Sequence, residues 1–254
     1  MGKSVLVTGA VSGTGLAIAK RFAAEHYDVF ITSRTTEGLD EAAAEISREF
    51  GVFAKGYELD SPGEAAVKTV FEDIRRLGYM VDCVVLSAAN LGIGQDFFEV
   101  ALQDFMDVFA TNLGWNFAIA RQGALQMREK GGGSIVFISS NTVYRAIPNR
   151  AAYSASKSGI TGLSRAMAVD LGKYGIRSNC VLPGMIKTER WQQSAELRKL
   201  PSNYTPIGDI ADFGDIADAA WFLGSEQAKN ITGAELIVDG GNTVQLYPIV
   251  PNNQ

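Results

Sequence analysis

The chain has 254 residues, of which 46% are hydrophobic and 20% charged, an ordinary globular mixture that can form one large α/β domain or two small ones. Its formal net charge of −5 excludes an overall attraction to nucleic acid or anionic membranes, and no apolar run approaches the roughly 20 residues of a membrane span. Residues 1–7 lack the layout of a signal peptide, so we expect a cytoplasmic protein that binds neither nucleic acid nor membrane.

Histidine and cysteine are rare, which limits the chemistry. His26 is the only histidine and lies in a helix-to-strand connection, so most schemes with a histidine base are excluded. Cys83 and Cys180 each lie in an apolar run and are interpreted as buried small hydrophobic residues rather than as a disulfide or a metal site. No cysteine and histidine cluster has zinc-ligand spacing, so we expect no metal. Acid–base chemistry must therefore use another side chain.

Strand-like and helical runs alternate through the first half of the chain. Strands are predicted at 4–7, 29–32, 53–59 and 82–87, and helices at 16–23, 39–50 and 64–77. Nearly continuous apolar runs are typical of strands covered on both faces in a parallel sheet. Their alternation with helices of about 10–15 residues indicates βαβ units.

The second half continues this alternation. Helices are predicted at about 102–127, 151–172 and 216–223, and strands at 134–139, 177–182 and 235–238. We therefore predict one domain, residues 1–254, with a doubly wound Rossmann fold of about seven parallel strands and helices on both faces. Residues 187–212 are polar, aromatic and irregular and are predicted to form a substrate lid. The tail, residues 242–254, is expected to pack on a neighbouring subunit or to cover the pocket.

A glycine-rich turn, residues 8–15, separates the first strand from the first helix. Its three glycines permit a tight turn, a close approach of the backbone to a pyrophosphate, and a helix that starts near the sheet. A phosphate can then bind the free N–H groups at the positive end of the helix. Without the strand and helix around it, the same pattern would be a structural turn. The predicted cofactor contacts here are Gly9, Ser12, Gly13, Thr14 and Gly15.

The end of the second strand bears on the choice of cofactor. An NAD enzyme carries an acidic residue there that binds the ribose 2′-hydroxyl, whereas this chain has Thr32-Ser33-Arg34-Thr35. Arg34 can pair with a 2′-phosphate through its planar guanidinium, and Ser33 can add a hydrogen bond. This pattern favours NADP(H) over NAD(H). The alternative is that Arg34 is an exposed loop arginine.

Tyr153 and Lys157 lie four residues apart near the start of the predicted helix 151–172, so they share one helix face. A nearby cation favours ionisation of tyrosine, which could then exchange a proton with a substrate hydroxyl during hydride transfer. Ser140 ends the preceding strand, where open α/β sheets bind ligands, and could hold the substrate oxygen. Taken singly, the tyrosine and lysine could be an ordinary helix pair, and Ser140 a turn cap.

Together these patterns resemble the short-chain dehydrogenase/reductase family. The family turn Thr-Gly-x-x-x-Gly-x-Gly matches residues 8–15, and the family set of Ser and Tyr-x-x-x-Lys matches Ser140, Tyr153 and Lys157. The resemblance extends from Lys3 to about Gly241, and it is to members such as 3-oxoacyl-(acyl-carrier-protein) reductases and alcohol or sugar dehydrogenases. It implies a homotetramer.

The resemblance also implies roles for residues that carry little signal alone. Asn112 matches an asparagine that holds a water linked to Lys157, although alone it could be a solvated helix residue or mark a bend. Asp60 matches an aspartate near the adenine ring. The segment 183–188 resembles a Pro-Gly-x-x-x-Thr segment that holds the nicotinamide carboxamide and phosphates, and 238–241 resembles a C-terminal signature near subunit interfaces. The implied contacts in the first of these segments are Pro183, Gly184, Ile186 and Thr188, and Tyr153 and Lys157 also contact the cofactor.

The stretch after the fourth strand departs from the family pattern. The family has Asn-Asn-Ala-Gly where this chain has Leu86-Ser87-Ala88-Ala89. Ala88 matches, and we place Ala88 and Ala89 among the cofactor contacts. Ala89 adds a methyl group where glycine lets the backbone reach the ribose, and Leu86 and Ser87 lack the amides that tie neighbouring strands together. The departure affects the local cofactor contacts rather than the catalytic group.

The sequence therefore predicts an NADP(H)-dependent oxidoreductase that acts on a secondary alcohol or ketone. Substrate candidates are a sugar, polyol, cyclic or steroid alcohol, or a 3-oxoacyl thioester, although the acidic net charge disfavours an acidic carrier protein. The alternatives are a non-catalytic NADP-binding sensor or scaffold, and an epimerase of the same family. Candidate pocket residues are Asn141, Tyr144, Met185 and Trp191; the two aromatic residues could equally be packing residues.

Overall fold

A computed structural model describes residues 2–60, 63–199 and 201–248. Seven parallel strands form one sheet in the order β3-β2-β1-β4-β5-β6-β7, which confirms the predicted doubly wound fold. The strands are β1 (Ser4–Thr8), β2 (Asp28–Ser33), β3 (Ala54–Glu58), β4 (Cys83–Leu86), β5 (Gly133–Ile138), β6 (Ile176–Pro183) and β7 (Glu235–Val238). No helix among the described residues is long and apolar enough to cross a membrane.

The order of the strands reverses between β1 and β4, which pair with each other although 74 residues of chain separate the end of one from the start of the other. Parallel strands point their carboxyl ends toward the same edge of a sheet, and the reversal opens a crevice at that edge. The glycine-rich turn follows β1 directly, and Ser87 follows β4. The topology therefore places the predicted cofactor residues at the crevice.

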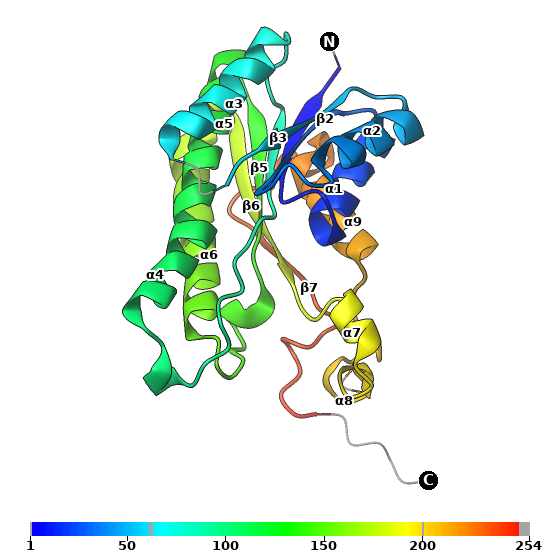
Figure 1. The fold of residues 1–254 in the computed structure, drawn as a ribbon, viewed down its shortest axis with the longest axis vertical. Helices are drawn as coiled ribbons and strands as arrows, with labels where there is room; N and C mark the ends of the chain where they lie inside the picture. The colour runs from blue at the N-terminus through cyan, green and yellow to red at the C-terminus, as the bar shows by residue number, and fades with distance from the viewer. Residues whose placement is uncertain (1, 61–62, 200, 249–254) are drawn as a thin grey trace.

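Helices cover both faces of the sheet (Figure 1). One layer holds α1 (Gly13–Ala24), α2 (Leu39–Phe50) and α9 (Phe213–Gly224). The other holds α3 (Glu64–Arg76), α5 (Asn116–Lys130) and α6 (Ala151–Leu171). Successive strand side chains alternate between the layers: Val5 and Val7 belong to the core under α1, and Leu6 to the core on the opposite face.

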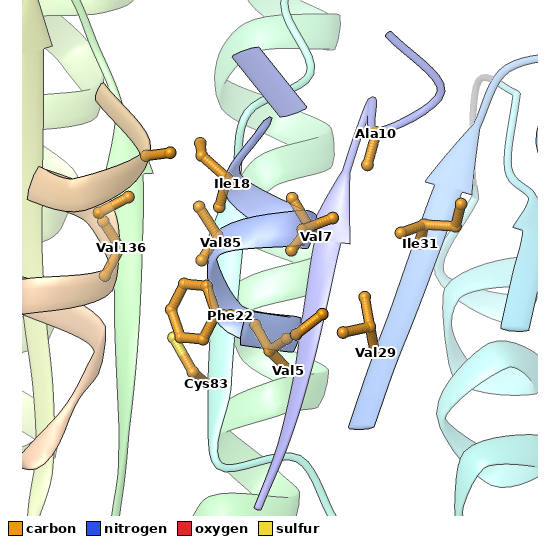
Figure 2. Packing of buried hydrophobic residues seen from close by; sticks show 14 of the residues in the cluster. Val5, Val7, Ala10, Ile18, Phe22, Val29, Ile31, Cys83, Val85 and Val136 are labelled. Carbon is orange, nitrogen blue, oxygen red and sulfur yellow. The ribbon is translucent and has the colours of Figure 1, made fainter. Parts of the chain in front are cut away.

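The core under α1 is packed mainly from small and branched residues, with Phe22 and Tyr27 as its buried aromatic residues (Figure 2). Phe22 of α1 is fully buried and lies close to Cys83 of β4 and Val5 of β1. Cys83 and Cys180 are both unpaired and buried, as expected for small hydrophobic residues. Among the residues that the structure describes, no group of three or more potential ligands could hold a metal ion.

The helix predicted at 102–127 is interrupted. The chain forms α4 (Leu102–Phe109), a π-helical segment η2 (Ala110–Trp115) and then α5. A π-segment inserts one extra residue into a helical turn, and such bulges are frequent at functional sites. Asn112 lies inside this segment and is fully buried. Apolar periodicity spans the whole stretch, so it could not locate the bulge.

The predicted lid contains short helices rather than purely irregular chain. These are α7 (Glu189–Gln193), the 3₁₀ turn η5 (Leu197–Lys199) and α8 (Pro201–Tyr204), which lie at the carboxyl edge of the sheet beside the C-terminal segment (Figure 1). The described part of the tail is tied to this region, because the Asn242 side-chain amide donates to the Tyr204 carbonyl at 2.8 Å. The last tail residues, 249–254, lie outside the described residues.

Candidate active site

The glycine-rich turn has the backbone geometry of a phosphate cradle. Gly9 and Gly13 have φ of +64° and +55°, in the left-handed region that favours glycine. A Cβ on Gly15 would lie 2.1 Å from the Gly9 carbonyl oxygen, so only glycine lets α1 start this close to β1. Ser12 precedes the helix, but its side chain makes no capping hydrogen bond. The first turn of α1 therefore faces the crevice without a side-chain cap, as anion binding at a helix N-terminus requires.

Thr8 joins the turn to the loop that departs from the family pattern. Its hydroxyl oxygen accepts hydrogen bonds from the main-chain N–H groups of Ser87 (3.0 Å) and Ala88 (3.1 Å). A Cβ on Gly9 would lie 3.0 Å from the Ala88 Cα, so the two segments are in close contact. This bracing comes from β1 and does not need the amide side chains that the chain lacks at positions 86 and 87.

A cavity of about 530 Å³, the glycine-turn cavity, extends from the turn past the end of β2. Most of the predicted cofactor residues line it: Gly9, Ser12, Gly13, Thr14, Gly15, Ser33, Arg34, Ala88, Ala89 and Thr188. Arg34 is exposed, and no carboxylate is found among the described residues of the lining. Ser33 is buried, and its hydroxyl oxygen accepts a hydrogen bond from the Thr35 N–H, with 3.5 Å between the oxygen and the nitrogen. The cradle and the uncapped helix fit the pyrophosphate of a dinucleotide cofactor.

Six predicted cofactor residues lie outside this lining: Tyr153 and Lys157, described below, and Asp60, Pro183, Gly184 and Ile186. Asp60 is exposed next to Leu59, which does line the cavity. Pro183 is the last residue of β6 and pairs with Val238. Ile186 packs on the core under α1, and Gly184 lines the neighbouring cavity instead.

Ser140 and Tyr153 line a second cavity of about 440 Å³, the tyrosine cavity. Leu91 lines both cavities, so they adjoin each other. Ser140 follows β5, and its hydroxyl oxygen accepts from the Thr142 N–H at 3.2 Å. Tyr153 lies in the first turn of α6. The strand end and the helix start thus bring two residues thirteen positions apart to one surface.

Tyr153 is held as a neutral phenol. Burial raises the pKa of Tyr153, while its hydrogen bond with the Ser140 hydroxyl and the positive charge of Arg150 act in the opposite direction. The raised pKa means that the phenol carries its proton at neutral pH. A protonated phenol in a cavity can donate that proton to a carbonyl oxygen.

Lys157 lies one helical turn after Tyr153 and is almost completely buried. Its Nζ donates to the Ile138 carbonyl at 2.8 Å and lies 5.6 Å from the centre of the Tyr153 ring. Burial lowers the pKa of Lys157 to about 8. The Lys157 carbonyl in turn accepts from the Ser139 hydroxyl at 3.1 Å, which fixes α6 against the end of β5.

Asn112 is bound to protein groups on both sides of its carboxamide. Its Oδ1 accepts from the Asn90 N–H at 2.7 Å, and its Nδ2 donates to the Asn90 carbonyl and to the Ser156 hydroxyl, each at 2.9 Å. Ser156 is fully buried and donates to the Tyr153 carbonyl at 2.8 Å. This chain of bonds links the loop after β4 to the backbone of Tyr153. Sequence reasoning missed Asn90 and Ser156, since neither is part of a pattern.

The predicted pocket residues divide into two pairs. Asn141 and Met185 line the tyrosine cavity, and the Asn141 amide donates to Asp239 at 3.3 Å and to Asn242 at 3.1 Å. Tyr144 and Trp191 are not among the lining residues.

Tyr144 and Trp191 lie in other surroundings. The Tyr144 hydroxyl donates to the Glu235 carboxylate on β7, which turns this side chain toward the sheet edge. Trp191 lies in α7, and its indole Nε1 is buried without a hydrogen-bond partner among the described residues. Two arginines that the sequence did not single out, Arg145 and Arg150, line the tyrosine cavity instead.

Comparison with known proteins identifies the family. A family model described as enoyl-(acyl carrier protein) reductase matches residues 9–243, which is most of the chain. The chain belongs to the short-chain dehydrogenase/reductase family. It is therefore an oxidoreductase by family, and the resemblance predicted from Ser140, Tyr153, Lys157 and the glycine turn is confirmed at that level.

Curated relatives align along almost the whole chain. A D-threitol dehydrogenase from Mycolicibacterium smegmatis is 33% identical over 252 residues, covering 96% of this chain and 94% of that protein. A 3-oxoacyl-(acyl-carrier-protein) reductase from Aquifex aeolicus is 32% identical over 243 residues, covering 94% and 97%. Among solved structures, L-sorbose reductase from Gluconobacter frateurii, complexed with NADPH and L-sorbose, has a TM-score of 0.90 at 28% identity, covering 96% of this chain and 98% of that one.

Proposed function

We propose that this short-chain dehydrogenase/reductase transfers a hydride between NADP(H) and a secondary alcohol or ketone, with Tyr153 as the general acid and base. The observation that carries the proposal is the placement of Ser140 and Tyr153 in one cavity that adjoins the glycine-turn cavity. The similarity to D-threitol dehydrogenase and to L-sorbose reductase supports a polar alcohol or ketone as substrate.

The cofactor and the protein divide the chemistry. Nicotinamide supplies the hydride donor or acceptor. In the reductive direction, the Tyr153 hydroxyl donates its proton to the substrate oxygen, and the Ser140 hydroxyl holds that oxygen in position. The charged Lys157 amine, near the ring of Tyr153, stabilises the phenolate that the proton transfer leaves behind. The Asn90, Asn112 and Ser156 bonds hold the Tyr153 backbone while its side chain reacts.

The preference for NADP(H) rests on Arg34. This arginine is exposed at the end of β2, in a cavity whose described lining has no carboxylate. A 2′-phosphate there would be attracted by the Arg34 guanidinium, and no carboxylate of the described lining would repel it. The similar solved structures include complexes with NADPH, NADH and NAD⁺, so the support for NADP(H) comes from Arg34 itself. The homotetramer and the cytoplasmic location that the sequence suggests remain predictions. Exposed apolar side chains at Phe97, Phe98 and Leu102 are consistent with an assembly.

The test follows nicotinamide absorbance with a panel of keto-sugars, cyclic ketones, steroid ketones and acetoacetyl thioesters, using NADPH and NADH. We expect turnover of at least one class with a KM for NADPH about tenfold or more below that for NADH. Arg34→Asp is expected to reverse the cofactor preference without abolishing turnover. Arg48→Gln, at an exposed position on α2, is the control.

Two results would contradict parts of the proposal. A wild-type preference for NADH would show that the Arg34 argument is wrong and leave the reaction intact. NADPH binding without turnover of any panel member would favour the alternative of a non-catalytic sensor.

A further inference from the structure

The tyrosine cavity is positively charged although the chain is acidic. The net charge of the chain is −5, yet Arg145 and Arg150 are the charged members of the cavity lining, and no carboxylate belongs to that lining among the described residues. The rest of the described lining is neutral. The local charge is therefore opposite to the charge of the whole molecule.

Both guanidinium groups are held by main-chain oxygens through one nitrogen. Arg150 donates from Nη1 to the carbonyls of Leu91 (3.1 Å) and Gly92 (2.7 Å). Arg145 donates from Nη1 to the carbonyls of Asn242 and Gln245, the second at 3.0 Å. Such bonds position a guanidinium but do not neutralise it. Within the described part of the chain, the Nε and Nη2 atoms of both residues make no hydrogen bond or ion pair.

Neither arginine forms an ion pair with a carboxylate of the described residues. Asp239 lies next to Asn141, and its oxygens accept from Asn141, from the N–H of Gly241 and from Thr243 rather than from an arginine. Asp104 lines a small adjoining cavity together with Arg150 and also makes no ion pair with it. A half-buried guanidinium that keeps free N–H donors and has no ion-pair partner among the described residues is available to bind an anionic ligand.

The positive charge of Arg150 acts on the phenol of Tyr153. It is one of the interactions that favour the ionised form of Tyr153. Gly94 lies beside this guanidinium, because a Cβ there would be in van der Waals contact with the Arg150 Cζ at 3.4 Å. A negative group bound by this arginine would thus lie in the cavity that also contains the Tyr153 hydroxyl and the Ser140 hydroxyl.

We propose that the substrate is a small hydroxy or oxo compound that carries a carboxylate or a phosphate group, which Arg145 and Arg150 bind while Ser140 and Tyr153 hold the reacting oxygen. This inference rests on the proposed function and names its substrate class. The planar fork of a guanidinium matches both anionic groups, and two such groups give orientation as well as affinity. A cavity of about 440 Å³ suits a small molecule.

The test compares ligands that share a carbon skeleton and differ in charge. Calorimetry measures the binding of D-gluconate, the neutral D-gluconamide, D-glucitol 6-phosphate and neutral D-glucitol to the protein saturated with NADP⁺, and nicotinamide absorbance measures turnover of each. We expect an anion to bind at least about tenfold more tightly than its neutral partner. The two pairs distinguish a carboxylate from a phosphate.

Variants show whether the arginines cause the preference. Arg145→Gln and Arg150→Gln are each expected to lower the ratio of anionic to neutral affinity about tenfold, whereas Lys at either position restores part of it. Arg48→Gln, an exposed change on another helix, should leave the ratio as it is. A loss of structure alone would weaken both ligands of a pair and leave their ratio intact.

The outcomes separate this inference from the function it rests on. Equal binding of charged and neutral partners, with turnover of a neutral alcohol, would overturn the anionic substrate and leave the oxidoreductase proposal standing. Arginine-dependent binding of an anion without turnover of any ligand would support the anion site and count against the proposed reaction. Failure of all four ligands to bind would contradict the inference, because it requires one of the two anionic groups to be recognised.

Discussion

The buried charge of Lys157 lowers the stability of the folded chain. The side chain is almost completely buried, its amine donates to the Ile138 carbonyl, and burial lowers its pKa from 10.5 to about 8. Between these two pH values the unfolded chain holds this proton more firmly than the folded chain. Stability therefore rises as the pH increases from 8 to 10.5, and the full cost of the buried charge is present below pH 8.

Lys157→Met tests this cost. Methionine has a similar volume and no charge, so we expect the variant to be more stable than the wild type at pH 7 by about 1–3 kcal/mol, with a smaller advantage at pH 10. Urea unfolding at both pH values measures the difference. Lys229→Met removes an exposed lysine and serves as the control. A variant that is less stable than the wild type by the same amount at both pH values would contradict the argument.

At the residue scale, sequence patterns located the residues that have a defined spacing and missed those held by tertiary contacts. Ser140 and Tyr153 were placed at one crevice because a strand end and a helix start must meet there. Arg150 belongs to no pattern, and only the folded loop after β4 brings its guanidinium to the cavity. Tyr144 was placed in the pocket by its position after the strand, but its bond to Glu235 turns it away.

At the scale of elements, the turn between β1 and α1 depends on close backbone contact. Gly15 sits where a Cβ would lie 2.1 Å from a carbonyl oxygen of the same turn, and backbone atoms cannot move aside as a side chain can. The strands were predictable because strands buried on both faces have nearly continuous apolar runs. Most helices were predictable because their apolar residues recur with helical periodicity. The π-segment around Asn112 was not, because the bonds of this side chain to Asn90 and Ser156 join residues that are distant in the sequence.

Gly15→Ala tests the role of the turn. We expect a loss of at least about 2 kcal/mol in the free energy of unfolding and a loss of NADPH binding, because the added methyl group must separate α1 from β1. Thermal unfolding and the fluorescence of bound NADPH measure the two effects. Gly172→Ala is the matched control: this glycine has helical backbone angles and nothing within 4 Å of an added Cβ. Unchanged NADPH affinity in Gly15→Ala would argue against the cradle.

At the scale of the whole molecule, one sheet brings two cavities of different character to the same edge. The glycine-turn cavity carries Arg34 beside an uncapped helix, and the tyrosine cavity carries two arginines beside a neutral phenol. Neither cavity has a carboxylate in the described part of its lining. The overall charge of −5 therefore describes the molecule but not the sites, which is why composition alone could not indicate an anionic substrate.

The central claim is that Tyr153 transfers the proton in a reaction that depends on NADP(H). Its most direct test compares wild-type protein with Tyr153→Phe, measuring NADPH affinity and turnover of the best substrate under the same conditions. The account predicts similar NADPH affinity and a kcat lower by about 10²–10⁴-fold, since phenylalanine keeps the ring and lacks the hydroxyl. Turnover of Tyr153→Phe at the wild-type rate would contradict the account.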